Sequence, residues 1–144
     1  MTATTLTPSA ALEELRRRGH RITVAREAIV TLVLGSHEPV TAGDVQARLS
    51  KKGKETNKVT VYRELAFLEK EGIVGAVQFE DGVRRYTSQD GGHRHHLICT
   101  QCKTVSHVEL PHDLDAVERR ISKTTDFTIE RHELEFYGRC GKCS

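Results

Sequence analysis

Apolar positions in the first half of the chain recur at helical spacing, and residues that favour helix N-caps precede most of these runs. The clearest case is the last run, where Val61, Leu65 and Leu68 follow one another at i, i+4 and i+7 after Thr56 and Asn57. Glycines close the first and last runs, at Gly19 and Gly72. The predicted helices cover residues 9–19, 23–35, 41–50 and 56–72.

The hydrophobic period then changes from that of helices to that of strands. Residues 73–79 and 83–87 read as two strands, and Asp81-Gly82 between them predicts a tight hairpin turn. Helices followed by one hairpin are the pattern of a winged helix-turn-helix, whose last helix enters the major groove of DNA while the hairpin flanks it. The first half is therefore predicted to be a DNA-binding domain.

A polar, glycine-containing segment predicts a hinge at residues 90–92, between domains at 1–89 and 93–144. In the second domain we expect short strands at 97–99 and 104–110 and a longer one over 127–138. A helix is expected after Pro111, with Leu114, Val117 and Ile121 on one face. The fold class is α+β. A domain this small has a marginal core, so metal or oligomerisation is expected to stabilise it.

Composition narrows the class of protein. With 37% hydrophobic and 29% charged residues, no apolar run of membrane-spanning length and no signal-peptide pattern, we expect a cytoplasmic protein without a membrane partner. The net charge of +2 does not by itself indicate nucleic acid. A basic stripe could nevertheless hold phosphate, the alternative being a merely solvated face. The stripe consists of Arg48, Lys51, Lys52, Lys54, Lys58 and Arg63.

The four cysteines form two C-x-x-C pairs, Cys99 with Cys102 and Cys140 with Cys143. In a reducing compartment such pairs favour metal binding over disulfides. Zinc takes four thiolates in a closed tetrahedron that leaves no position for substrate, so the predicted site is structural. The alternative is four free thiols or a redox pair.

The remaining candidate ligands are histidines and acids. His93, His95 and His96 lie beside the hinge, and His132 precedes the final cysteines. Imidazole and carboxylate together suit zinc, iron(II), manganese or nickel. A site across the hinge would let metal fix the angle between the two halves. The acids that could complete such a site are Glu109, Asp113 and Asp115.

These features together resemble the ferric uptake regulator family of bacterial metal-responsive repressors. The resemblance is carried in order by TVYREL at 60–65, the DG hairpin, HRHHLICTQC at 93–102 and RHELEFYGRCGKC at 131–143. It implies a homodimer with an N-terminal winged helix and a C-terminal α/β dimerisation domain. Metal loading would make that dimer bind palindromic operators in double-stranded DNA and repress genes of metal homeostasis, iron or zinc.

The resemblance also assigns residues. It implies structural Zn²⁺ on the four cysteines, and a second site formed by His93, His95 and His132 with Asp113 or Asp115 in place of the family's acid. Tyr62 matches a base-contacting tyrosine and Arg63 a phosphate-contacting arginine. The DNA-binding set implied is Lys58, Thr60, Tyr62 and Arg63.

The hinge sensor site departs from the family pattern. Pro39 and Arg94 occupy places where sensor histidines are usual, and Thr87 or Ser88 one where an acid or cysteine is common. His107 likewise stands in the place of a glutamate. The sensor ligands then expected are His96, His37 and Glu109, binding Fe²⁺, Zn²⁺ or Mn²⁺. These departures count against a peroxide sensor.

The sequence admits three other interpretations. A zinc-uptake-regulator type of sensor remains open because His96, His37 and Glu109 could bind zinc. A zinc-ribbon interaction module would not explain the histidines. A zinc hydrolase would need a general base beside an open metal position, and no residue is recognisably placed for that role. We therefore expect no enzymatic activity and no small organic substrate.

Overall fold

The computed structural model describes residues 6–89, 94–110 and 114–144, and of Arg94 only the backbone. The chain divides into two compact units, Met1–Gly91 and Gly92–Ser144, and each is described by itself. The expected hinge at residues 90–92 lies outside the described residues. None of the helices described is long and apolar enough to cross a membrane.

Four helices of the first unit begin where the sequence offers a side-chain cap. Thr7 accepts a hydrogen bond from the backbone of Ala10, Thr23 from Arg26 and Asn57 from Thr60, and Thr41 and Asp44 form a reciprocal capping box. The predicted caps at Thr23, Thr41 and Asn57 are thus all used. The helices are α1 (Pro8–Arg17), α2 (Val24–Gly35), α3 (Ala42–Lys51) and α4 (Lys58–Lys70).

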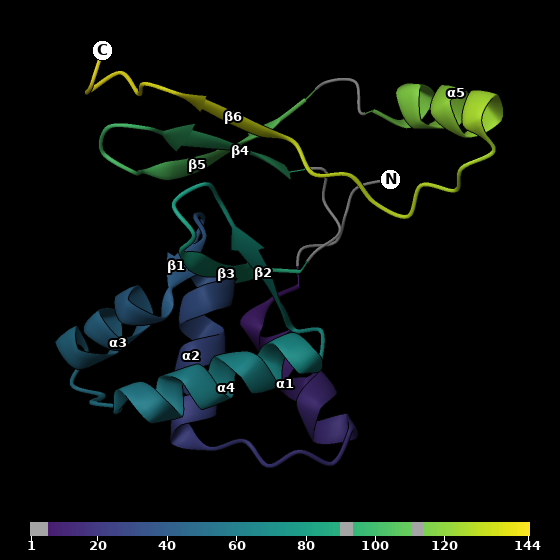
Figure 1. Ribbon diagram of the computed structural model, residues 1–144. Coiled ribbons are helices and arrows are strands. Elements are labelled where there is room, and N and C mark those ends of the chain that lie inside the picture. Colours follow the sequence, from purple (N-terminus) through teal and green to yellow (C-terminus); the bar gives the residue numbers. More distant parts are fainter. Residues whose placement is uncertain (1–5, 90–93, 111–113) are drawn as a thin grey trace. The chain divides into compact units, whose positions relative to one another are not determined.

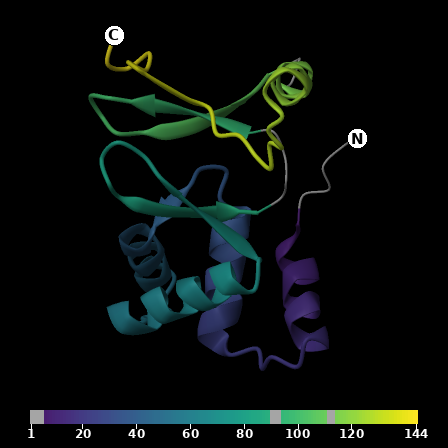
Figure 2. The ribbon, with the colours of Figure 1, turned by 45° about the vertical axis from the view of Figure 1, so that its right-hand side comes forward.

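A three-stranded antiparallel sheet completes the first unit, in the order β1-β3-β2. Strands β2 (Val74–Gln78) and β3 (Arg84–Ser88) form the predicted hairpin, and β1 (Val40–Thr41) adds to its edge, with Val40 opposite Tyr86. The sheet lies beside the helices (Figures 1 and 2). Leu15, Ile29, Val45, Leu65 and Val74 are fully buried in one continuous core. Helices, hairpin and core together make a winged helix-turn-helix.

Helix α4 is held against α2 by a charged and aromatic contact. The Arg26 guanidinium donates to both carboxylate oxygens of Glu64, at 2.8 and 3.2 Å, and stacks 3.9 Å from the centre of the Phe67 ring. Both charged side chains are mostly buried, at 14% and 12% exposure, so the pair is shielded from water and salt. This contact fixes the rotation of α4 about its own axis.

Among the residues described, the second unit contains a three-stranded sheet of order β5-β4-β6 and one helix. Strand β4 (Arg94–Cys99) pairs antiparallel with β5 (Val105–Glu109) and parallel with β6 (Glu135–Gly138). Helix α5 (Asp115–Thr125) lies between β5 and β6 in the chain. The buried residues described here are few, namely His95, Ile98, Cys99 and Val105.

One prediction for the second unit needs correction, and one of its elements, the helix after Pro111, forms as expected. The strand expected over 127–138 is confined to residues 135–138, because only that stretch has a partner in β4. Helix α5 begins at Asp115, with Leu114 as its N-cap, and it buries none of its residues within the described part of the chain. Val117 and Ile121, two of the apolar residues expected on one face of this helix, are 44% and 39% exposed.

Candidate metal centres and nucleic-acid interface

The four cysteine sulfurs converge at one end of the second sheet. Cys99 ends β4, Cys102 follows in the turn to β5, and Cys140 and Cys143 follow β6. All four Sγ atoms lie within 4.8 Å of one another, and those of Cys102 and Cys140 are 3.7 Å apart. The parallel pairing of β4 with β6 brings the second pair to the first, because Cys99 lies opposite Gly138.

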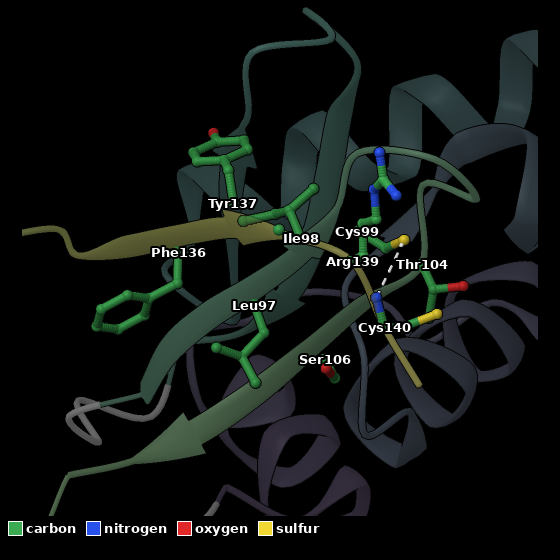
Figure 3. A pocket seen from close by; sticks show the side chains of 10 residues that line it. Leu97, Ile98, Cys99, Thr104, Ser106, Phe136, Tyr137, Arg139 and Cys140 are labelled. Carbon is green, nitrogen blue, oxygen red and sulfur yellow. Dashed lines mark hydrogen bonds between the residues drawn. The ribbon is translucent and has the colours of Figure 1, made fainter. Parts of the chain in front are cut away.

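Backbone groups prepare this cluster for thiolates. The amide of Cys102 donates to Cys99 Sγ at 3.5 Å, and the amide of Cys140 donates to it at 3.4 Å (the dashed line in Figure 3). Both hydrogen bonds lower the pKa of the Cys99 thiol, to about 5. The Thr104 hydroxyl, 3.1 Å from Cys102 Sγ, lowers the pKa of that thiol too. The neighbouring Cys140 thiol, by contrast, raises the pKa of Cys143 to about 12. Four sulfurs this close cannot all ionise unless a cation joins them.

Zinc fits this arrangement. A tetrahedral ion with Zn–S bonds of about 2.3 Å spaces its sulfurs by roughly 3.8 Å, close to the 3.7 Å between Cys102 and Cys140. The donor set is all sulfur, and an ion bound by four thiolates keeps no open position. The predicted ligands Cys99, Cys102, Cys140 and Cys143 therefore lie together as a structural zinc site requires.

A second set of ligand side chains surrounds His95. The His95 side chain is buried, at 2% exposure, and its Nε2 has no hydrogen-bond partner within the described part of the chain. Its ring stacks on that of His132, with centroids 5.5 Å apart. On the other side of His132, Nδ1 lies 2.5 Å from Glu118 Oε1. Two imidazoles and a carboxylate from β4, α5 and the segment before β6 thus form one cluster.

Glu118 is the residue of this cluster that the sequence did not reveal. Of the acids expected there, Asp113 lies outside the described residues, as does the expected ligand His93. Asp115 is the first residue of α5, and Glu118 follows three positions later, on the same face of the helix. The sequence does show that Glu118 lies three residues after the predicted acid Asp115. It does not show where the helix begins, and the helix start decides which of these acids faces His132.

The residues expected in the hinge sensor site fall in different units. His37 is an exposed residue of the first unit, after α2, whereas His96 and Glu109 lie on β4 and β5 of the second. Within the second sheet His96 stands directly opposite His107, and Glu135 flanks it on β6. Burial lowers the pKa of His96, which favours the neutral imidazole that binds metals.

The expected DNA-binding residues occupy the first turns of α4. Lys58, Tyr62 and Arg63 are exposed, and the Lys58 ammonium lies 5.9 Å from the centre of the Tyr62 ring. Thr60 is half-buried, and its backbone amide donates to the Asn57 cap at 2.8 Å. The basic stripe is exposed throughout, so its cations are available to phosphates. The stripe comprises Arg48, Lys51, Lys52, Lys54, Lys58 and Arg63.

Fold and sites together define a winged-helix, metal-binding protein of the kind that regulates transcription. Residues 17–137 match the model of the Ferric uptake regulator family. The chain is 33% identical over 132 residues to the peroxide-responsive repressor PerR of Staphylococcus epidermidis, covering 92% of this chain and 87% of the relative. Its structure is similar to the Helicobacter pylori ferric uptake regulator, at a TM-score of 0.82 with 23% identity and coverage of 96% and 95%.

A zinc-bound manganese uptake regulator is also similar, with a TM-score of 0.74, 31% identity and coverage of 90% of this chain and 98% of that one. The chain belongs to the ferric uptake regulator family. Its members are metal-dependent regulators of transcription, which confirms the resemblance read from the sequence. The interpretation as a zinc-ribbon module without sensing is not favoured over this one.

Proposed function

We propose that this protein is a metal-loaded repressor that binds palindromic operators as a homodimer and controls genes of iron or zinc homeostasis in the cytoplasm. The observation that carries the proposal is the buried His95 nitrogen without a hydrogen-bond partner within the described residues, beside His132 and Glu118. Buried polar atoms are normally paired. A bound cation would supply the missing partner of His95 Nε2. The same chain carries a helix of the DNA-binding type, so metal and DNA binding would be combined in one protein.

In this proposal the zinc on the cysteines is structural, the His95 cluster binds a second divalent ion, and the hinge site senses the regulatory metal. The unit that carries both sites buries few apolar residues of its own. Zinc on the cysteines would hold the segment after β6 against the turn after β4. His95, His132 and Glu118, with His93 of the sequence prediction, would then bind a second divalent ion. Glu118 would serve either as a ligand or as the acceptor that fixes the tautomer of His132.

We assign the hinge sensor to His96, with His37 and Glu109 as the further ligands expected from the sequence. His107 is an additional candidate, because it lies opposite His96 in the antiparallel pair and directly opposite side chains are close neighbours. A set richer in imidazole than in carboxylate would favour Zn²⁺ over Mn²⁺. Comparing operator affinity in the presence of Fe²⁺, Zn²⁺ and Mn²⁺ would identify the regulatory ion.

The second unit would supply the dimer contact. Leu97 and Phe136 pair across β4 and β6 on the same face of the sheet (Figure 3), and they are 38% and 43% exposed. They line a hollow of about 230 Å³ that also reaches Cys99 and Cys140 of the cysteine cluster. Val117 and Ile121 of α5 are similarly exposed. A second copy covering these side chains would bury apolar surface that one chain leaves in water.

The test is operator binding titrated against metal. Protein that retains the cysteine-bound zinc is mixed with duplexes selected from a random pool, and the affinity is measured with Zn²⁺, Fe²⁺ or Mn²⁺ added or absent. We expect at least one metal to raise the affinity more than tenfold and the preferred duplex to be palindromic. Equal affinity with and without all three metals would refute metal-dependent repression.

A peroxide response is a second candidate function, favoured by the 33% identity to a peroxide-responsive repressor. The substitutions at the hinge weigh against it, since Pro39 and Arg94 replace usual sensor ligands. Exposing the iron-loaded and the manganese-loaded protein to hydrogen peroxide separates the two functions. Loss of DNA binding in the iron form alone would support the peroxide response, and equal DNA binding in both would exclude it.

A further inference from the structure

The exposed face of α4 carries apolar side chains in addition to the polar ones expected of a DNA-binding helix. Val59 is 64% exposed and Tyr62 48%, and Ala66 is exposed as well. Their spacing of i, i+3 and i+7 places them on one side of the helix. The opposite side carries the buried residues of α4. The exposed side is therefore a separate apolar stripe.

Packing within the first unit does not account for Val59. The residue is the second of α4, and the helix start is held by Asn57, whose side chain accepts from the backbone of Thr60. Val59 is among the most exposed large apolar residues described, and it lies in the first turn of the helix. The N-terminal turns of a recognition helix are those whose side chains reach base edges in the major groove.

A valine side chain can recognise only one feature of a base edge. It has no hydrogen-bond donor or acceptor, and the apolar group in the major groove is the C5-methyl of thymine. Its two methyls sit on a β-branched carbon that is stiff at χ1 in a helix, so little rotamer freedom is lost on contact. Valine at this position thus suits thymine and offers nothing to the polar edges of guanine or cytosine.

We propose that Val59 is a specificity-determining residue that packs against the C5-methyl of a thymine, adjacent to the base contacted by Tyr62. The inference rests on the proposed operator binding and specifies one base of the half-site. Burying one methyl-sized group changes an equilibrium constant by about fourfold. A palindromic site read by two copies would show the effect once in each half.

The experiment replaces thymine by deoxyuridine, which removes the methyl and leaves the Watson–Crick edge unchanged. Metal-loaded protein is titrated with a duplex selected from a random pool, and then with duplexes carrying one deoxyuridine at each thymine in turn. The unmodified chain, Val59→Ala and Val24→Ala are compared. Val24 is the matched control, because it is a 78% exposed valine at the first position of α2.

We expect one thymine per half-site whose methyl contributes about fourfold in the unmodified chain and in Val24→Ala, but not in Val59→Ala. The inference is overturned if no methyl effect depends on residue 59, or if Val24→Ala abolishes the same effect. Both variants should keep the parent melting temperature, since each side chain is exposed. Failure of the metal-loaded parent to bind any selected duplex would instead refute the proposed function, and this inference with it.

Discussion

Replacing His95 by leucine should change stability in opposite directions in the absence and presence of metal. The His95 ring is 2% exposed, and its Nε2 has no hydrogen-bond partner within the described residues. An unsatisfied buried nitrogen costs about 1–3 kcal/mol. Leucine fills a similar volume without that atom. With no metal bound at the His95 cluster, His95→Leu should therefore be neutral or stabilise the second unit by up to about that amount.

With metal bound, the parent should be the more stable protein. An ion at one hundred times its dissociation constant stabilises the native state by about 2.7 kcal/mol. The variant should lose most of that gain, because one of its ligands is missing. The difference in unfolding free energy between parent and variant is thus expected to reverse sign on adding Mn²⁺.

The assay is calorimetric unfolding of both proteins with the cysteine-bound zinc retained, before and after Mn²⁺ is added. His20→Leu serves as the control, because His20 has a partner, Glu71 Oε1 at 3.2 Å, and lies in the first unit. His20→Leu should lower the unfolding free energy by the same amount with and without Mn²⁺. If His95→Leu destabilises the metal-free protein by as much as the metal-loaded one, His95 is an ordinary core residue and the reasoning is wrong.

Three further outcomes are expected. Cys102→Ser should release zinc and dissociate the dimer, because the second unit buries few apolar residues. Metal analysis and sedimentation check this, and a dimeric zinc-free variant would contradict it. Arg63→Ala should weaken binding to all duplexes alike and reduce the salt slope by about 1; an unchanged slope would exclude a phosphate contact. Leu65→Ala, at a fully buried position, should cost about 2–5 kcal/mol of stability in the first unit, whereas metal binding by the second unit should persist in calorimetric titrations.

The helices of the first unit and its hairpin could be predicted from local signals alone. Thr23, Thr41 and Asn57 each cap the helix predicted to follow, and the hairpin forms on either side of Asp81-Gly82. Strand β1 could not be predicted, because two residues carry no periodicity and the pairing of Val40 with Tyr86 is a contact between distant parts of the chain. The hydrophobic pattern identifies helices and longer strands, whereas a short strand such as β1 forms only because the tertiary fold brings it beside β3.

The candidate sites show the same contrast between what local sequence predicts and what only tertiary contacts determine. C-x-x-C spacing predicts the cysteine cluster, because each pair sets its own geometry within one turn. The place of Glu118 depends on where α5 begins, and an offset of three residues exchanges one acid for another. His132, expected within a strand, precedes β6 instead, and its contact with His95 follows from tertiary packing. Ligands contributed by separate elements are therefore the hardest to read from the chain.

The side of helix α4 that packs against the core and the side proposed to contact DNA are opposite one another. The contact of Arg26 with Glu64 and Phe67 fixes its orientation, while Val59 and Tyr62 face outward without supporting the core. In the proposed function, substitutions on the outward side would change which operators are bound at almost no cost in folding stability. Gene duplicates would then acquire new operators by changes at these few positions, while the residues proposed to bind metal stay the same.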